Sequence, residues 1–134
     1  MKRFLPFFAV LFVVCLTACH EKIVAPEDAP KEALRSALEA LNRGDYDTYM
    51  SYVDYGVEMD SVRKSYMRNA ISQHVGWRTA RKASVVAIDM VDAEMEGDSV
   101  CTVFYRYTFA AGADEVAVQK MVLNDGEWKL KVRD

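Results

Sequence analysis

Cysteine and histidine are scarce in this chain of 134 residues, which has three cysteines and two histidines. Cys15 and Cys19 lie within the first twenty residues, so only Cys101 remains in the rest of the chain. A single thiol forms no intramolecular disulfide. With one thiol and two imidazoles, His20 and His74, the chain after Cys19 also has fewer than the four nitrogen and sulfur ligands of a structural zinc site.

Several signatures of catalysis and metal binding are missing as well. The sequence contains no phosphate-binding loop, no serine nucleophile elbow and no paired-cysteine motif. The acidic run that begins at Asp92 has the spacing of the start of a calcium loop, but Val103 stands where the loop needs a bidentate glutamate. We therefore expect neither a bound metal ion nor a cofactor.

The first residues have the pattern of a secretory signal. Lys2 and Arg3 precede an uncharged apolar run at residues 4–18, which is shorter than the roughly 20 residues that span a bilayer. Residues 16–19, LTAC, resemble the bacterial lipobox. This resemblance implies cleavage before Cys19 and acylation of its sulfur and of the new amino group, for example by palmitate.

The sequence thus predicts three segments: a lipoprotein signal peptide at 1–18, a lipidated tether at 19–29 and one domain at 30–134. Residues 19–134 carry 15 basic and 20 acidic side chains, a net charge of −5. This acidic balance argues against a nucleic-acid partner. His20 rather than aspartate follows the lipobox cysteine, which favours the outer membrane of a bacterial envelope.

Hydrophobic periodicity predicts three helices in the first part of the domain, at about 30–43, 45–53 and 60–79. Gly44 ends the first helix, and Asp45 caps the second. We expect the apolar face of the third helix to point into the core. That face consists of Val62, Tyr66, Met67, Ala70, Ile71, His74 and Trp77.

The second part of the domain alternates between apolar and polar residues, as strands do. Strands are predicted at about 83–91, 100–110, 116–123 and 127–132, and Asp125-Gly126 is a strong hairpin signal. Short links make neighbouring strands antiparallel. The expected fold is α+β, with the three helices packed on one side of a curved four-stranded meander sheet.

Two motifs carry a resemblance to a known superfamily. They are the Gly44-Asp45-Tyr46 turn within LNRGDYDTYMSYV and the tryptophan of the terminal DGEWKLKV, Trp128. In this order they resemble the cone-shaped nuclear-transport-factor-2-like superfamily over residues 27–133, and especially its small lipoproteins with lumazine-binding-like domains. The resemblance implies a sheet wrapped around a long helix and enclosing a pocket. Members include isomerases, dehydratases, polyketide cyclases and non-catalytic binding modules.

The candidate pocket residues are aromatic and titratable. They are Tyr49, Tyr66, His74, Trp77 and Tyr105. His74 is a candidate acid–base group, with Asp54 as its possible partner, because superfamily enzymes use such dyads. The alternative is a core or rim histidine that is bonded to a neighbour, and we expect its ring to be largely shielded from water. The tyrosines at 46, 49, 52 and 55 line a pocket rim or belong to the core and an interface.

We expect a non-catalytic domain that is held at the envelope membrane through its lipid and binds a small ligand or a protein partner. One alternative is an isomerase- or dehydratase-type enzyme that uses His74 and Asp54. Another is a structural subunit of an envelope assembly that uses an exposed sheet face. The acid-free window 61–88, with its six cations, is either a surface for an anionic ligand or lipid headgroups, or an ordinary solvated face.

Replacing Cys19 with serine tests the predicted anchor. We expect Cys19→Ser protein to leave the membrane fraction and to lack the mass of the acyl chains, because two or more chains are needed for stable anchoring. Membrane fractionation and intact-mass spectrometry measure both effects. A variant that still pellets with membranes and keeps the added mass would overturn the prediction.

Overall fold

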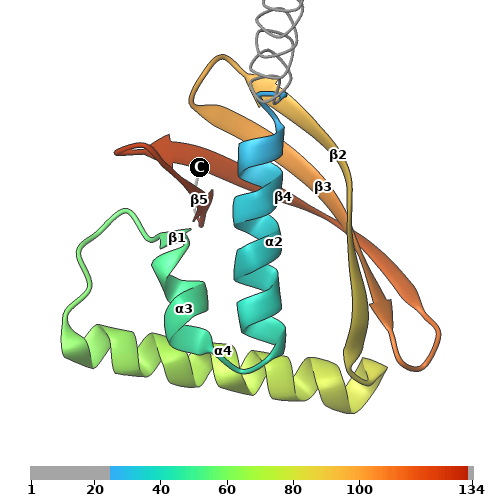
Figure 1. Cartoon of the computed structure of the whole chain (residues 1–134). Coiled ribbons are helices and arrows are strands. Elements are labelled where there is room, and N and C mark those ends of the chain that lie inside the picture. The colour runs from blue at the N-terminus through green and yellow to red at the C-terminus, as the bar shows by residue number, and fades with distance from the viewer. Residues whose placement is uncertain (1–24, 133–134) are drawn as a thin grey trace, which may run out of the picture.

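The computed structural model describes residues 25–132. The predicted signal peptide, Cys19 and the first residues of the tether lie outside this range. Within it the chain forms three helices and a five-stranded sheet (Figure 1). None of these helices has the length and apolar character needed to cross a bilayer.

Helix α2 (Asp28–Asn42) starts two residues earlier than predicted and buries Leu34, Ala37, Leu38 and Leu41, which recur in the sequence at helical spacing. Pro30 lies in its first turn, where a missing N–H costs no hydrogen bond. Gly44, with φ of 83°, ends the helix: its N–H donates to the Leu41 carbonyl, and the Asp45 N–H donates to the Ala40 carbonyl. These two bonds form a Schellman motif, which favours glycine at this position.

Helix α3 (Tyr46–Ser51) begins where α2 has just ended. The Asp45 carboxylate caps it by accepting a hydrogen bond from the Thr48 N–H at 3.3 Å. Hydrogen bonding with the Thr48 side chain, followed by this backbone bond, lowers the pKa of Asp45. Gly44 therefore ends α2, and Asp45 caps the start of α3.

A short strand, β1 (Val53–Asp54), corrects the prediction of four strands. The predicted second helix extends through Val53. Instead, the chain leaves the helix at Tyr52, whose carbonyl accepts the Leu130 N–H at 2.7 Å. Val53 then pairs with Leu130 in parallel. Two residues are too few for a visible period of two, so the pattern gave no signal of this strand.

The remaining strands are antiparallel neighbours, as predicted: β2 (Val85–Glu96), β3 (Val100–Phe109), β4 (Asp114–Asn124) and β5 (Glu127–Lys131), in the sheet order β1-β5-β4-β3-β2. The hairpin prediction is confirmed, because Asp125 and Gly126 both have positive φ between the paired Asn124 and Glu127. Strand β2 is longer than predicted. Two register shifts along it bend the sheet.

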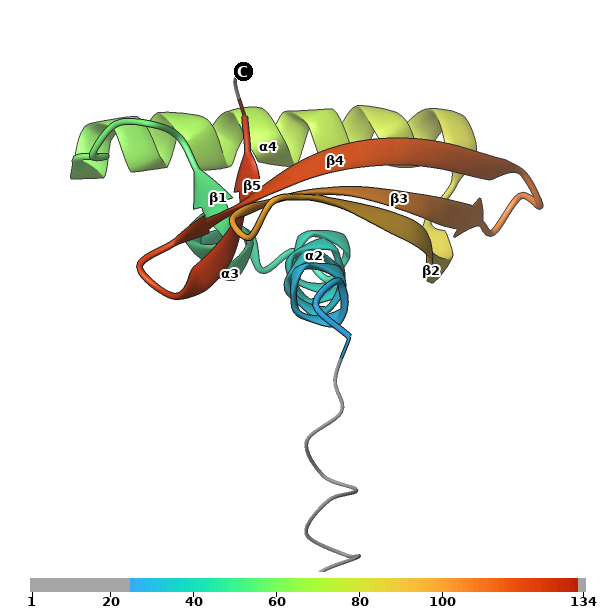
Figure 2. The same cartoon turned by 90° about the horizontal axis from the view of Figure 1, so that it is seen from above.

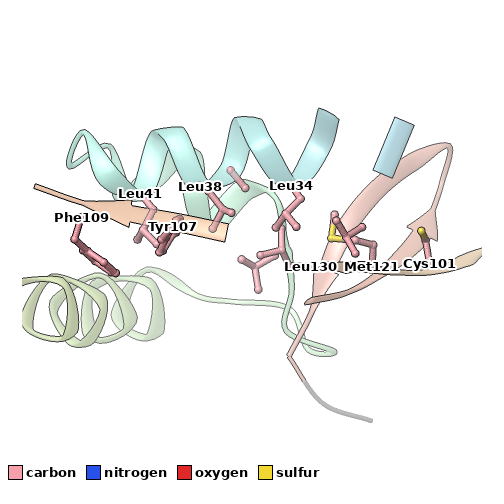
Figure 3. Close-up of a cluster of buried hydrophobic side chains, with 11 residues drawn as sticks. Leu34, Leu38, Leu41, Cys101, Tyr107, Phe109, Met121 and Leu130 are labelled. Carbon is pink, nitrogen blue, oxygen red and sulfur yellow. The ribbon is translucent and has the colours of Figure 1, made fainter. Parts of the chain in front are cut away.

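The core lies between α2 and the inner face of this sheet. Figure 2 shows α2 end-on against one side of the curved strands. Figure 3 shows the leucines of α2 above the side chains of β3, β4 and β5. The core residues are Leu34, Ala37, Leu38, Leu41, Val53, Cys101, Val103, Tyr107, Phe109, Met121 and Leu130. Leu34, Cys101 and Met121 are fully buried, and removing such a leucine side chain typically costs about 2–5 kcal/mol.

Helix α4 (Ser61–Lys82) differs most from the prediction. It runs across the end of α2 (Figure 1) and has no buried residue. Ile71 and Val75 are the side chains that pack against the core, whereas Tyr66 and Trp77 are 75% and 66% exposed. The helix is therefore rotated by roughly a third of a turn from the predicted orientation, so that Ile71 of the predicted face still packs against the core, whereas Tyr66 and Trp77 do not.

Candidate functional site

A cavity of about 230 Å³ lies inside the cone, where α2, α3 and α4 meet the inner face of the sheet. Its lining combines three leucines, three tyrosines and five smaller or polar side chains. These residues are Leu38, Leu41, Tyr49, His74, Arg78, Tyr105, Tyr107, Glu115, Ala117, Gln119 and Leu130. Apolar walls with a few converging polar groups are typical of ligand sites.

Tyrosine side chains form much of one wall. Tyr105 and Tyr107 face the same way because they are two positions apart on β3, and their rings meet edge to face with centroids 5.4 Å apart. Tyr49 reaches the same space from α3. The α3 helix, fixed by the Asp45 cap, thus supplies one tyrosine and the sheet supplies two.

Burial keeps these phenols neutral. It raises the pKa of Tyr105 to about 12, and it also raises the pKa values of Tyr49 and Tyr107. Asn42 and Arg78 act in the opposite direction on Tyr107, but desolvation is the larger effect. Near neutral pH the three hydroxyls therefore remain protonated and can donate hydrogen bonds.

Arg78 brings a positive charge to the cavity. Its Nη2 donates to Asn42 Oδ1 at 2.5 Å, and its guanidinium lies 5.2 Å from the centre of the Tyr107 ring. Asn42 is itself held by α2, since its Nδ2 donates to the Leu38 carbonyl at 2.7 Å. These contacts position the guanidinium at the junction of α2, α4 and β3.

Glu115 is the carboxylate in the cavity lining, and it is already paired. It accepts from the Lys82 ammonium, which also lies 5.5 Å from the centre of the Phe109 ring. In the part of the chain that the structure describes, Arg78 has no carboxylate within ion-pair distance. The net charge of Arg78, Lys82 and Glu115 together is therefore +1.

The five predicted pocket residues lie in two different parts of the structure. Tyr49, His74 and Tyr105 line the cavity. Tyr66 and Trp77 lie on the outer face of α4 and point away from it. His74 is at the cavity's exposed edge, so the expectation of a ring shielded within the core was wrong. All of these differences follow from the rotation of α4.

Asp54 lies elsewhere, beside a larger open cleft of about 780 Å³ between α3, α4 and the β4–β5 turn. Its Oδ1 accepts the Gly56 N–H at 2.8 Å, and its Oδ2 accepts from Asn124 Nδ2 at 2.7 Å. These bonds give Asp54 a structural role in the turn that follows β1. The proposed Asp54–His74 pair remains a prediction without a contact to support it.

Sequence reasoning missed Arg78, Tyr107, Glu115 and Asn42 as site residues. Arg78 follows His74 by four positions, so helical spacing places the two on neighbouring turns of one face. Tyr107 follows Tyr105 by two on an alternating strand. These two could have been found from spacing. Glu115 and Asn42 could not, because only the packing of the sheet, α2 and α4 brings them to the cavity.

Metal binding has no evident site in the region that the structure covers. Within residues 25–132, no three side chains among His, Cys, Asp and Glu converge in a way that could hold an ion. Cys101 is fully buried in the core, and this burial raises the pKa of its thiol. A buried neutral thiol of this kind is a packing residue.

Comparison with known proteins shows similarity in fold. No family model matches the chain, and no curated protein matches it in sequence. A Campylobacter jejuni protein described as a candidate NTF2-like transpeptidase has a similar structure, with a TM-score of 0.63 and 18% identity over 78% of this chain and 98% of its own. The fold is nuclear-transport-factor-2-like.

A second solved structure shares this arrangement less closely. It is a SEC-C motif containing protein from Rhodopseudomonas palustris, with a TM-score of 0.51 and 16% identity over 77% of this chain and 75% of that one. Identities this low show the fold alone. The nuclear-transport-factor-2-like cone accommodates many unrelated activities, so function has to be argued from the side chains of the cavity.

The raised pKa of Tyr105 predicts a loss of stability at alkaline pH. The unfolded chain releases the phenolic proton near pH 10, whereas the folded chain holds it until about pH 12. This contribution is therefore complete below pH 10 and is lost as pH rises toward 12. We expect the unfolding free energy of Tyr105→Phe to fall less steeply than that of the wild type between pH 9 and 11. Denaturant titrations measure the difference, and equal slopes would contradict the assignment.

Proposed function

We propose that this protein is an envelope lipoprotein whose nuclear-transport-factor-2-like domain binds a small ligand in the cavity of its cone. The observation that carries the proposal is the set of three protonated tyrosines and one arginine around an apolar space of about 230 Å³. Drug-sized pockets are roughly 300–1,000 Å³. The ligand is therefore small.

The lipid anchor at Cys19 and the location at the outer membrane are part of the same proposal. They rest on the LTAC motif and on His20 after it. The likeness to lumazine-binding-like lipoproteins adds the expectation of a flat ligand, which the edge-to-face pair of Tyr105 and Tyr107 suits.

Binding is a better account of the cavity than acid–base catalysis. A general base must be ionisable near the working pH, and the raised pKa values of the phenols prevent this role for the tyrosines. His74 keeps a position at the cavity edge, but Asp54 lines a different cleft. The proposed enzyme thus lacks its second group in the described geometry.

Filling the cavity tests the proposal. Ala117 lines the cavity, while its neighbour Val118 is 57% exposed and points to the other face of β4. We expect the wild-type protein and Val118→Phe to retain a small-molecule adduct in native mass spectrometry after incubation with a metabolite extract. Ala117→Phe should lose the adduct, because its ring occupies the ligand's space.

Melting curves of both variants serve as the control for folding. Two outcomes would count against ligand binding in the cavity. One is a wild-type protein that stays free of adducts after incubation, and the other is an adduct that persists unchanged in folded Ala117→Phe protein.

The outer face of the sheet favours self-association as a second candidate function. Four valines there or at the adjoining bulges are 49–62% exposed: Val86, Val91, Val116 and Val118. At one edge of this face, β2 also carries the exposed acids Asp89, Asp92, Glu94 and Glu96. On the other side β5 carries Lys129, which the register places beside Val122, and Lys131 two residues further.

This distribution of charge is complementary to itself. A twofold axis parallel to the strands places β2 of one copy opposite β5 of the other, so that acids face lysines, with the valines of the outer face, Arg106 and Lys120 between them. We therefore propose a homodimer through this face as the structural role of the domain in the envelope.

Sedimentation velocity of the domain tests the dimer. We expect Val118→Lys to shift the protein to monomer, because the substitution removes an exposed valine from the interface and the new ammonium loses its hydration there. Val62→Lys is the control, since Val62 is 75% exposed but lies on α4. Equal dissociation of both variants, or a wild type that is monomeric at high concentration, would argue against this interface.

A further inference from the structure

The guanidinium of Arg78 has unused hydrogen-bonding capacity at the cavity. Its Nε is buried and has no hydrogen-bond partner, although one Nη2 bond goes to Asn42. A buried donor without an acceptor is costly, and more so when it carries charge. Such groups in native proteins call for an explanation, and a bound acceptor is one.

Other cations of α4 do not share this property. Arg68 donates from Nε and Nη2 to Asp47 Oδ1 at 2.9 and 2.6 Å. Lys82 pairs with Glu115. Arg78 is thus distinguished from Arg68 and Lys82, which also point toward the body of the protein, because its charge is balanced by no carboxylate within residues 25–132.

Hydrogen-bond donors surround Arg78 in the cavity, since the hydroxyls of Tyr49 and Tyr105 line it in their protonated form. The carboxylate in the same lining, Glu115, is already paired with Lys82. The apolar part of the wall includes Leu38 and Leu130. A ligand that satisfies these groups needs acceptor oxygens at one end and an apolar surface at the other.

Resting on the small-ligand function proposed above, we propose that the ligand is a small organic monoanion with a carboxylate on a flat or apolar body. The carboxylate accepts hydrogen bonds from Arg78 and from the phenols, and the body packs against Leu38, Leu130 and the tyrosine rings. Arginine suits this role because its planar fork matches a carboxylate with two parallel hydrogen bonds.

Two probe molecules of nearly equal shape test this class of ligand. Benzoate carries a carboxylate, and benzamide replaces it with a neutral amide. Titrations followed by two-dimensional amide NMR of the domain report both affinity and location. We expect benzoate to shift the signals of Tyr105 and Ala117 and to bind at least about tenfold more tightly than benzamide, since the ionic hydrogen bonds are lost with the amide.

Matched arginine variants assign the preference to one side chain. Arg78→Gln should reduce the benzoate affinity to about that of benzamide, and Arg78→Lys should restore it in part because the charge returns without the planar fork. Arg81→Gln removes the same charge from an exposed position three residues along the helix. It should leave the preference unchanged, which separates local recognition from a general effect of net charge.

The outcomes distinguish this inference from the function on which it rests. Benzamide binding as tightly as benzoate in the cavity, or a benzoate preference that survives in folded Arg78→Gln protein, would overturn the anion inference and leave ligand binding intact. Failure of both probes would also overturn it, while a cavity-dependent adduct in the mass spectrum would still support the proposed function. If Arg78→Gln does not fold, the comparison of Arg78→Lys with Arg81→Gln decides in the same way.

Discussion

The burial of one face of α2 against the curved sheet is the interaction on which the rest of the structure depends. Leu34 and Leu38 of this helix reach the side chains that β3, β4 and β5 direct inward, and the resulting core is almost wholly apolar (Figure 3). Burial of this kind is the largest favourable contribution to folding. It also determines where the cavity lies, because the cavity occupies the space at the end of α2 where the leucines stop and Asn42 begins.

Helix α4 closes this space by a different kind of interaction. It has no fully buried side chain, and its attachment combines the partly buried Ile71 and Val75 with polar contacts of Arg68, Arg78 and Lys82. Exposed ion pairs contribute little stability, often less than about 1 kcal/mol each. A helix held mainly in this way is suited to border a ligand site, because small adjustments of its position break few apolar contacts.

Local chemistry allowed much of the fold to be predicted. The glycine at 44 and the aspartate at 45 end one helix and start the next, and the Asp125-Gly126 pair turns β4 into β5. The alternation in β3 correctly separated inward from outward residues. The same alternation continues in Ala93 and Met95 beyond the predicted end of β2, but the intervening acids made this part look like a loop. Of the candidate site, Tyr49, His74 and Tyr105 line one cavity, whereas Tyr66 and Trp77 lie exposed on α4.

The sequence alone determined the α+β class, the inward face of α2 and the turns, because these depend on contacts within a few residues of the chain. Only the tertiary structure decided which side of α4 faces the core. That helix has apolar residues on two sides. Ile71 lies at the edge of the predicted face, and the neighbouring side with Val75 also carries Arg68, Arg78 and Lys82, so it looks like a solvated face. It turns inward because Asp47, Asn42 and Glu115, distant in the chain, meet those cations in the folded protein. Partners of this kind are set by the packing of the whole domain, and no local pattern records them.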